Sequence, residues 1–385
     1  MSLADRHRSR TLTDSQRDWL RVREYLQQHR YELGLAAAEE YPNLLTVPES
    51  PLLTRQKWLP SKPLRLDAID LQFAPESPFT GLTSTEPATA SVRPHRPNGS
   101  RYLTYSAAMA DLAAPAVFEN RSTYRLLDAD LSGPRGRMVF SRGTYFDGID
   151  LGEAAAHEYA ASQLDGADTP LRCAIGDPCD PARRPMNLAI SALTIRHDRS
   201  SGEATVLLHW RDPAKVGHAG GLYMVVPVGI FQASDDHAES ERNDFSLWHC
   251  VVREYAEELL GESEDHSGGE VPIDYDDWPF AARMTAALKS GRIRAHILGM
   301  GIDPLTFAAD LLTVIVFDAP LFDELFSELV ETNAEGRFVS PSRGEGFPFV
   351  ENTIRQVIQD QPVQAAGTAS MTLALRNRAS LLSRT

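Results

Sequence analysis

The stretch NDFSLWHCVVREYAEELLGE, residues 243–262, has the apolar spacing of a helix that packs on one side. Its large apolar residues recur at helical intervals and would form one stripe against a sheet: Trp248, Val251, Val252, Tyr255 and Leu259. On another side Glu254, Glu257 and Glu258 are spaced so that their carboxylates can converge within one turn. The pattern predicts a helix over about 245–261 with an apolar face and an acidic face.

The acidic face has two interpretations. Carboxylates on one turn repel one another unless they face water, pair with bases such as Arg253, or share a cation. Taken alone, EYAEE is typical of a solvated helix face. As a metal site its hard oxygen ligands would suit Mg²⁺ or Mn²⁺.

The flanking sequence favours the metal site. REYAEE at 253–258 resembles the core of the Nudix box, in which Arg-Glu, an apolar residue, any residue and Glu-Glu precede a glycine. Upstream, GLYMVVPVGIFQ at 221–232 resembles the strand and loop that lead into that box, with PVG where Pro-Gly-Gly is common. The resemblance covers about residues 186–362 and implies an α/β fold, a Nudix-like mixed β-sheet sandwiched by helices.

The leading half of the box departs from the family pattern. The opening glycine of the box would fall at Glu239, and its first glutamate would fall at Phe245. If Gly229 is the equivalent glycine, ten residues have been inserted, and the acidic run DDHAESERND at 235–244 would form a longer loop. Gly261 also arrives one residue late. The metal-binding half is therefore present, while the leading half is remodelled.

The resemblance implies that Glu254, Glu257 and Glu258 are metal ligands and that Arg253 orients one of them. The implied activity is Mg²⁺- or Mn²⁺-dependent hydrolysis of a nucleoside diphosphate-linked, or related diphosphate, small molecule. The alternative is a catalytically inactive Nudix-like ligand-sensing or regulatory protein. A carboxylate returned to the site by the inserted loop would favour hydrolysis. The segments TYFDGID and RPMNLAIS resemble a bacterial group labelled regulatory, which favours the alternative.

Ahead of this region the chain divides by composition. A capping box at Thr13 and Gln16 predicts one long helix that, with a basic arm before it, makes up residues 1–41. The Pro-rich residues 42–100 are typical of an extended linker, and 101–170 of a separate α+β region that would shape the substrate entrance or a homodimer. The last segment, residues 363–385, is expected to be a C-terminal tail.

Composition excludes several classes of protein. The 385 residues are 42% hydrophobic and 24% charged, without an apolar run of a membrane span or a signal segment, so a cytoplasmic protein without membrane contact is expected. The net charge of -15 argues against nucleic acid as a partner, although seven arginines lie between residues 6 and 30. Three cysteines without a zinc-binding pattern suit a reducing compartment.

Overall fold

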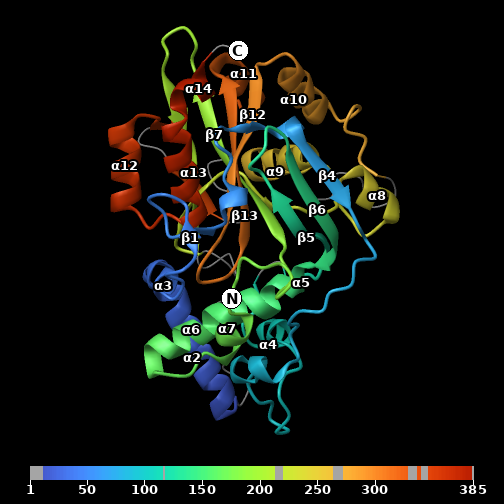
Figure 1. Cartoon of the computed structure of the whole chain (residues 1–385), viewed down its shortest axis with the longest axis vertical. Helices are drawn as coiled ribbons and strands as arrows, with labels where there is room; N and C mark the ends of the chain where they lie inside the picture. Colours follow the sequence, from blue (N-terminus) through green and yellow to red (C-terminus); the bar gives the residue numbers. More distant parts are fainter. Residues whose placement is uncertain are drawn as a thin grey trace.

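Figure 1 shows the computed structural model, in which a long sheet carries helices on both faces and a group of helices lies at its lower end. The structure describes residues 12–115, 118–212, 220–262, 272–327, 336–339 and 346–383. The first eleven residues, which include part of the expected basic arm, lie outside this set. Among the described helices, none has both the length and the hydropathy to cross a bilayer.

The main sheet mixes parallel and antiparallel pairs. Its order is β1-β2-β12-β13-β7-β8-β15, with β11 also beside β7 and β3 also beside β12. The long central strands β7 and β13 run parallel, and buried residues occupy most of their length, as expected for strands covered on both faces. The strands are β1 Leu45–Thr46, β2 Leu53–Thr54, β3 Leu64–Arg65, β7 Leu188–His197, β8 Ala204–Val206, β11 Val228–Ile230, β12 Ile293–Ile302, β13 Ala309–Asp318 and β15 Phe347–Pro348.

Two smaller sheets flank the main one. One has the order β10-β9-β14 and the other β4-β6-β5. The alternation in YRLLDADL and RGRMVFSRGTYF predicts two strands joined at Ser132-Gly133-Pro134, and the antiparallel β5–β6 hairpin confirms them. The strands are β4 Ile69–Phe73, β5 Ser122–Asp130, β6 Gly136–Thr144, β9 Leu208–Arg211, β10 Tyr223–Val225 and β14 Gly336–Val339.

Helices cover both faces of the main sheet. On one face α9, α10 and α11 contribute to the larger hydrophobic core, and on the other α12, α13 and α14 contribute to a second core. The helices are α8 Ala238–Asn243, α9 Leu247–Leu260, α10 Pro279–Lys289, α11 Ala319–Leu325, α12 Glu351–Asp360, α13 Ala365–Arg376 and α14 Arg378–Leu382. The mixed α/β class is thereby confirmed. Residues 363–385, expected as a tail, instead supply α13, whose small buried residues let it lie close on the sheet.

A separate group of helices comes from the first half of the chain. The helices are α2 Asp14–Gln28, α3 Arg30–Ala38, α4 Tyr105–Leu112, α5 Tyr145–Gly148, α6 Ala154–Asp165 and α7 Pro170–Ile175, with a π-helical turn at 149–153. The capping box is confirmed, since the Thr13 hydroxyl accepts from Gln16 N and Thr13 N donates to Gln16 Oε1. The single long helix predicted here is divided in two at His29.

The Pro-rich residues 42–100 do not run free as an extended linker. Strands β2 and β3 hydrogen-bond to β12, and Val47, Leu52 and Leu53 have no exposed surface. Three 3₁₀ turns, Gln56–Trp58, Leu66–Ala68 and Pro87–Val92, carry the rest around the molecule. Short edge strands tolerate the many prolines because few of their N–H groups are needed for pairing. The division into domains stays a prediction.

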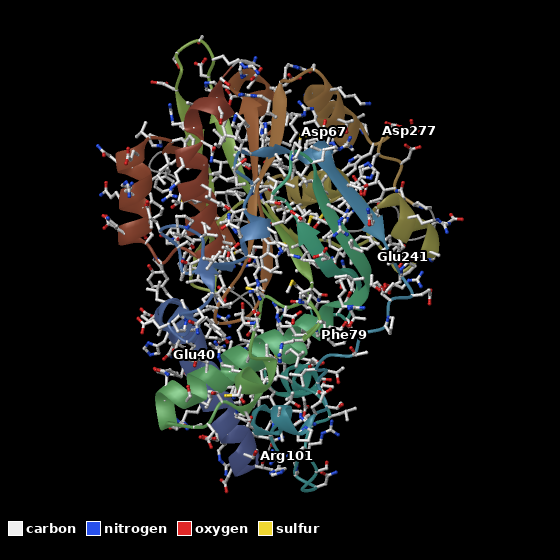
Figure 2. All side chains as sticks on the ribbon, viewed as in Figure 1. Glu40, Asp67, Phe79, Arg101, Glu241 and Asp277 are labelled. Carbon is white, nitrogen blue, oxygen red and sulfur yellow. The ribbon has the colours of Figure 1, made fainter. Side chains whose placement is uncertain are left out.

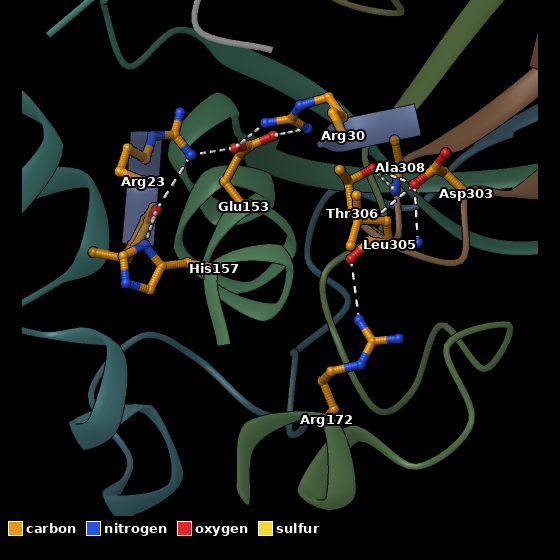
Figure 3. A network of polar contacts seen from close by, with 10 residues as sticks. Arg23, Arg30, Glu153, His157, Arg172, Asp303, Leu305, Thr306 and Ala308 are labelled. Carbon is orange, nitrogen blue, oxygen red and sulfur yellow. Dashed lines mark hydrogen bonds and ion pairs between the residues drawn. The ribbon is translucent and has the colours of Figure 1, made fainter. Parts of the chain in front are cut away.

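Buried polar contacts hold the helices of this group together and attach them to the main sheet (Figure 3). Glu153 is 2% exposed and accepts from Arg23 at 2.5 Å and from both terminal nitrogens of Arg30 at 3.0 Å. Arg172 donates to two backbone carbonyls of residues 304–305, in the turn between β12 and β13. A side chain at Gly152 would overlap a carbonyl oxygen of that same turn. The helical group therefore packs directly on the β12–β13 turn.

Candidate functional site

The apolar face of α9 packs as its sequence pattern predicts. The Tyr255 hydroxyl lies 2.6 Å from the Thr194 hydroxyl of β7, and Trp248 Nε1 donates to a hydroxyl of α10. The Ser246 hydroxyl accepts from the N–H of the third residue of the helix, and Gly261 ends the helix in the left-handed region, with φ at 70°. These contacts fix the rotation of α9 about its axis, and with it the direction of the glutamates.

The glutamates of α9 lie against the start of β11. Glu258 is only 8% exposed and accepts the backbone N–H of Val228 at 2.6 Å. A Cβ built on Gly229 would overlap the carboxyl group of Glu254, so a glycine is required where that carboxyl meets the strand. Glu257 is partly buried. The interpretation as a solvated face is therefore wrong for Glu258.

Carboxylate oxygens are suitable ligands for Mg²⁺ or Mn²⁺, and the Glu254 carboxyl fills the space that a side chain at position 229 would take. Across the described ranges, however, no three His, Cys, Asp or Glu side chains are arranged as a group that could hold a metal ion. The donor chemistry thus fits a hard divalent cation, while an assembled three-residue ligand group is not observed in that part of the chain.

Arg253 has a different environment from the one expected. Its guanidinium donates to the Tyr275 hydroxyl and to the Gln232 carbonyl, each at 2.6 Å, and lies 3.4 Å from a carboxylate oxygen of Asp244. Tyr275 in turn donates to Asp244 at 2.8 Å. None of these groups is a glutamate of α9. Arg253 therefore joins α9 to the loops around it, and its expected role of orienting a metal ligand is not observed.

Burial sets the protonation of the groups around Arg253. It lowers the pKa of His249, whose ring stacks on Tyr275 with centroids 3.8 Å apart, and it raises the pKa of the Cys250 thiol. Burial also opposes the charge on Arg253, but its contacts with the Tyr275 hydroxyl and the Asp244 carboxylate outweigh burial and raise the pKa of the guanidinium. At neutral pH the surroundings of α9 therefore contain the neutral imidazole of His249, the neutral thiol of Cys250 and the ion pair of Arg253 with Asp244.

Phe245 stands where the resemblance to the Nudix box would place its first glutamate. Its ring lies in a cluster of aromatic rings that joins α9 to the β4-β6-β5 sheet. The rings lie 5.0–5.8 Å from it, centroid to centroid: Phe73, Tyr124, Phe140 and Phe231. Position 245 therefore makes an apolar contact with the neighbouring sheet.

The inserted loop is bound to the rest of the protein at two residues, Glu241 and Asp244. Glu241 of α8 forms an ion pair with Arg142 of β6 at 2.7 Å, and its carbonyl accepts from the Tyr124 hydroxyl (Figure 2 labels Glu241). Asp244, the last residue of the insert, is fully buried beside Arg253. The loop thus returns the Asp244 carboxylate to α9. That carboxylate forms an ion pair with Arg253, so it is not available as an additional ligand beside the three glutamates.

Asp244 and Tyr275 were not among the predicted site residues. Asp244 lies nine positions before Arg253, one further than the box requires, and a one-residue shift of that kind was the available signal. Tyr275 lies in the loop before α10 and carries no motif. Its role depends on how that loop closes over α9.

No protein-family model matches this chain, and a search of curated proteins finds no match either. The Nudix resemblance therefore depends on the residues quoted above, and it remains a prediction.

Proposed function

We propose that this protein is a divalent-metal-dependent hydrolase of a diphosphate-linked small molecule, with its site where α9 meets the start of β11. The observation that carries the proposal is the contact of the Glu254 carboxyl with the bare backbone at Gly229, beside the Glu258–Val228 hydrogen bond. This contact places the Glu254 carboxylate directly on the backbone at the start of β11, beside the carboxylate of Glu258, so two of the three glutamates meet the same segment.

Glu254, Glu257 and Glu258 would hold the Mg²⁺ or Mn²⁺ ion, which when bound supplies charge neutralisation and an activated water. Rotation of their side chains about α9 would bring the three carboxylates together. The chain's own contribution is positional. The buried pair of Arg253 and Asp244 keeps α9 in one orientation, so that the glutamates stay directed at β11.

A second candidate is a ligand-sensing or regulatory protein without turnover. It is favoured by the lack of an assembled three-residue metal-binding group in the ranges that the structure covers, and by the aromatic docking role of Phe245. In this candidate the same surface binds a phosphorylated ligand, and the inserted loop transmits binding to the β5–β6 hairpin.

The test uses the full-length protein with Mg²⁺ or Mn²⁺ and a panel of nucleotide sugars, dinucleotides and nucleoside triphosphates. A hydrolase should be stabilised against heat by the ion, following mass action, and should release phosphate-containing products only when the ion is present. Both effects should disappear in Glu257→Gln and persist in Glu324→Gln, an exposed glutamate of α11.

The outcomes separate the two candidates. Thermal stabilisation by a phosphorylated ligand without any product would favour the sensing protein. If no divalent ion stabilises the wild type and no member of the panel is cleaved, the hydrolase proposal is wrong.

A further inference from the structure

Strand β4, Ile69–Phe73, forms an edge of the β4-β6-β5 sheet. Within the described ranges β6 is its only strand partner, and Figure 1 shows β4 as the outer strand, with β6 between it and β5. Natural sheets protect such edges with prolines, lysines or bulges, because a free edge can pair with another chain. The sequence of β4, IDLQF, has no proline or lysine, and its register against β6 is unbroken. This edge therefore has the form of a strand that can accept a partner.

The direction of the backbone groups shows which residues of β4 face the free edge. Ala74 N donates to the Phe140 carbonyl of β6 at 2.7 Å, so the backbone groups of alternate residues before Ala74 also point to β6. Those of Ile69, Leu71 and Phe73 point the other way, where no backbone group of the described chain hydrogen-bonds with them. The N–H and C=O groups of these three residues therefore form a row with which another strand can pair.

The two faces of β4 have different side chains. Ile69, Leu71 and Phe73 are partly buried and pack against the larger hydrophobic core. On the other face Asp70 and Gln72 are exposed, and Gln72 Nε2 donates to a carboxylate oxygen of Asp70 at 2.6 Å. The packing of the apolar face holds the strand in its extended form before a partner binds, which lowers the entropy cost of pairing.

A second copy of this chain matches the edge. Two identical strands related by a two-fold axis pair antiparallel, and an axis at Leu71 places Leu71 opposite itself and Ile69 opposite Phe73 of the second copy. These residues have the outward N–H and C=O groups, so each such pair can exchange two backbone hydrogen bonds. The same register places Asp70, the one charged residue of the strand, opposite Gln72 of the second copy. The Gln72 amide has two N–H groups, of which one bonds its own Asp70 and the other can donate across the axis.

We propose that β4 is a homodimerisation edge, at which two copies of this chain pair through antiparallel β4 strands centred on Leu71. The dimer joins the two β4-β6-β5 sheets into one continuous sheet. A pairing of 5 residues from each copy is small, so the dimer should be weak and depend on the protein concentration. The proposal is independent of the hydrolase function at α9.

Position 72 provides two variants with opposite expected effects. Both change an exposed side chain and leave the backbone pairing in place. In Gln72→Asp a second carboxylate lies opposite Asp70 of the other copy, so the like charges weaken the dimer. In Gln72→Lys an ammonium group lies opposite that carboxylate, so the opposite charges strengthen the dimer. Gln356→Asp and Gln356→Lys, at an exposed position of α12, are matched controls for the change in net charge.

The experiment is sedimentation velocity of the full-length protein over about a hundredfold range of concentration. The wild type should shift from 42.5 kDa towards twice that mass as the concentration rises. The dissociation constant should rise by about fivefold in Gln72→Asp and fall by a similar factor in Gln72→Lys, because each dimer contains two symmetry-related pairs. Loss of folding cannot mimic this result, since one of the two variants must strengthen the dimer. A wild type that stays at 42.5 kDa throughout, or a dimer that responds equally to changes at positions 72 and 356, would overturn the proposal.

Discussion

Replacing Asp244 by Asn tests whether the inserted loop supplies the counter-charge of Arg253. Asp244 is fully buried and accepts from Ser234 N at 2.7 Å and from the Tyr275 hydroxyl at 2.8 Å, beside the guanidinium at 3.4 Å. Asparagine keeps the volume but removes the charge, which leaves a buried cation. Breaking a buried pair in this way destabilises a protein by about 3–5 kcal/mol. We expect about 3 kcal/mol, because Arg253 keeps its bonds to Tyr275 and to the Gln232 carbonyl.

The assay is urea unfolding followed by tryptophan fluorescence, since Trp248 lies in α9 itself. Asp277→Asn is the control, because Asp277 is exposed in the loop before α10 (Figure 2) and should change stability by less than about 0.5 kcal/mol. The double variant Asp244→Asn with Arg253→Met should lose less stability than the sum of the two single variants, because it removes both charges. A loss below about 1 kcal/mol for Asp244→Asn would refute the reasoning.

Three further predictions concern other parts of the fold. Glu153→Gln leaves two buried arginines without their counter-charge, so its urea midpoint should fall by the equivalent of about 3–5 kcal/mol. A thiol reagent at pH 8 should modify Cys173 in the native protein but Cys179 and Cys250 only after unfolding. Both of the latter are buried, and burial raises the pKa of Cys179 to about 12 and also raises the pKa of Cys250. Mass spectrometry identifies the modified cysteines. Burial lowers the pKa of His157 to about 3 from its ordinary value of 6.5, so between these two pH values the native state binds fewer protons than the unfolded state. The free energy of unfolding should therefore fall as the pH drops from about 6.5 towards 3. This fall should be smaller in His157→Gln.

Elements with strong local periodicity could be predicted from the sequence. The apolar stripe of α9, the capping box at Thr13 and the alternating β5–β6 hairpin all appear in the structure. In each case the signal lies within one element, because the spacing of apolar residues reflects which face is covered. The mixed α/β class followed from the order of these elements.

The segments that sequence patterns missed have no such local signal. Strands β1 to β3 have two residues each, too few to show alternation. They form because β2 and β3 pair with β12 and β1 pairs with β2. Helix α13 is buried around most of its circumference, so its apolar and small residues form no clear stripe. The partners of Arg253, which are Gln232, Asp244 and Tyr275, come from three separate loops, and only the folding of the chain brings them together.

The surroundings of α9 explain why residues 235–245 differ from the Nudix pattern that residues 253–258 resemble. Phe245 points into the aromatic cluster that docks the β4-β6-β5 sheet, so a carboxylate at that position would be buried among rings. The counter-charge of Arg253 comes instead from Asp244, one position earlier, where Tyr275 and a backbone N–H satisfy it. Since Arg253 and Asp244 contact Tyr275 and backbone groups and no glutamate of α9 in the described ranges, Asp244→Asn should lower stability with or without a divalent ion. Glu257→Gln should instead abolish only the increase in stability that the divalent ion produces. Equal loss of ion-independent stability in both variants would mean that the glutamates belong to the same structural network as Arg253.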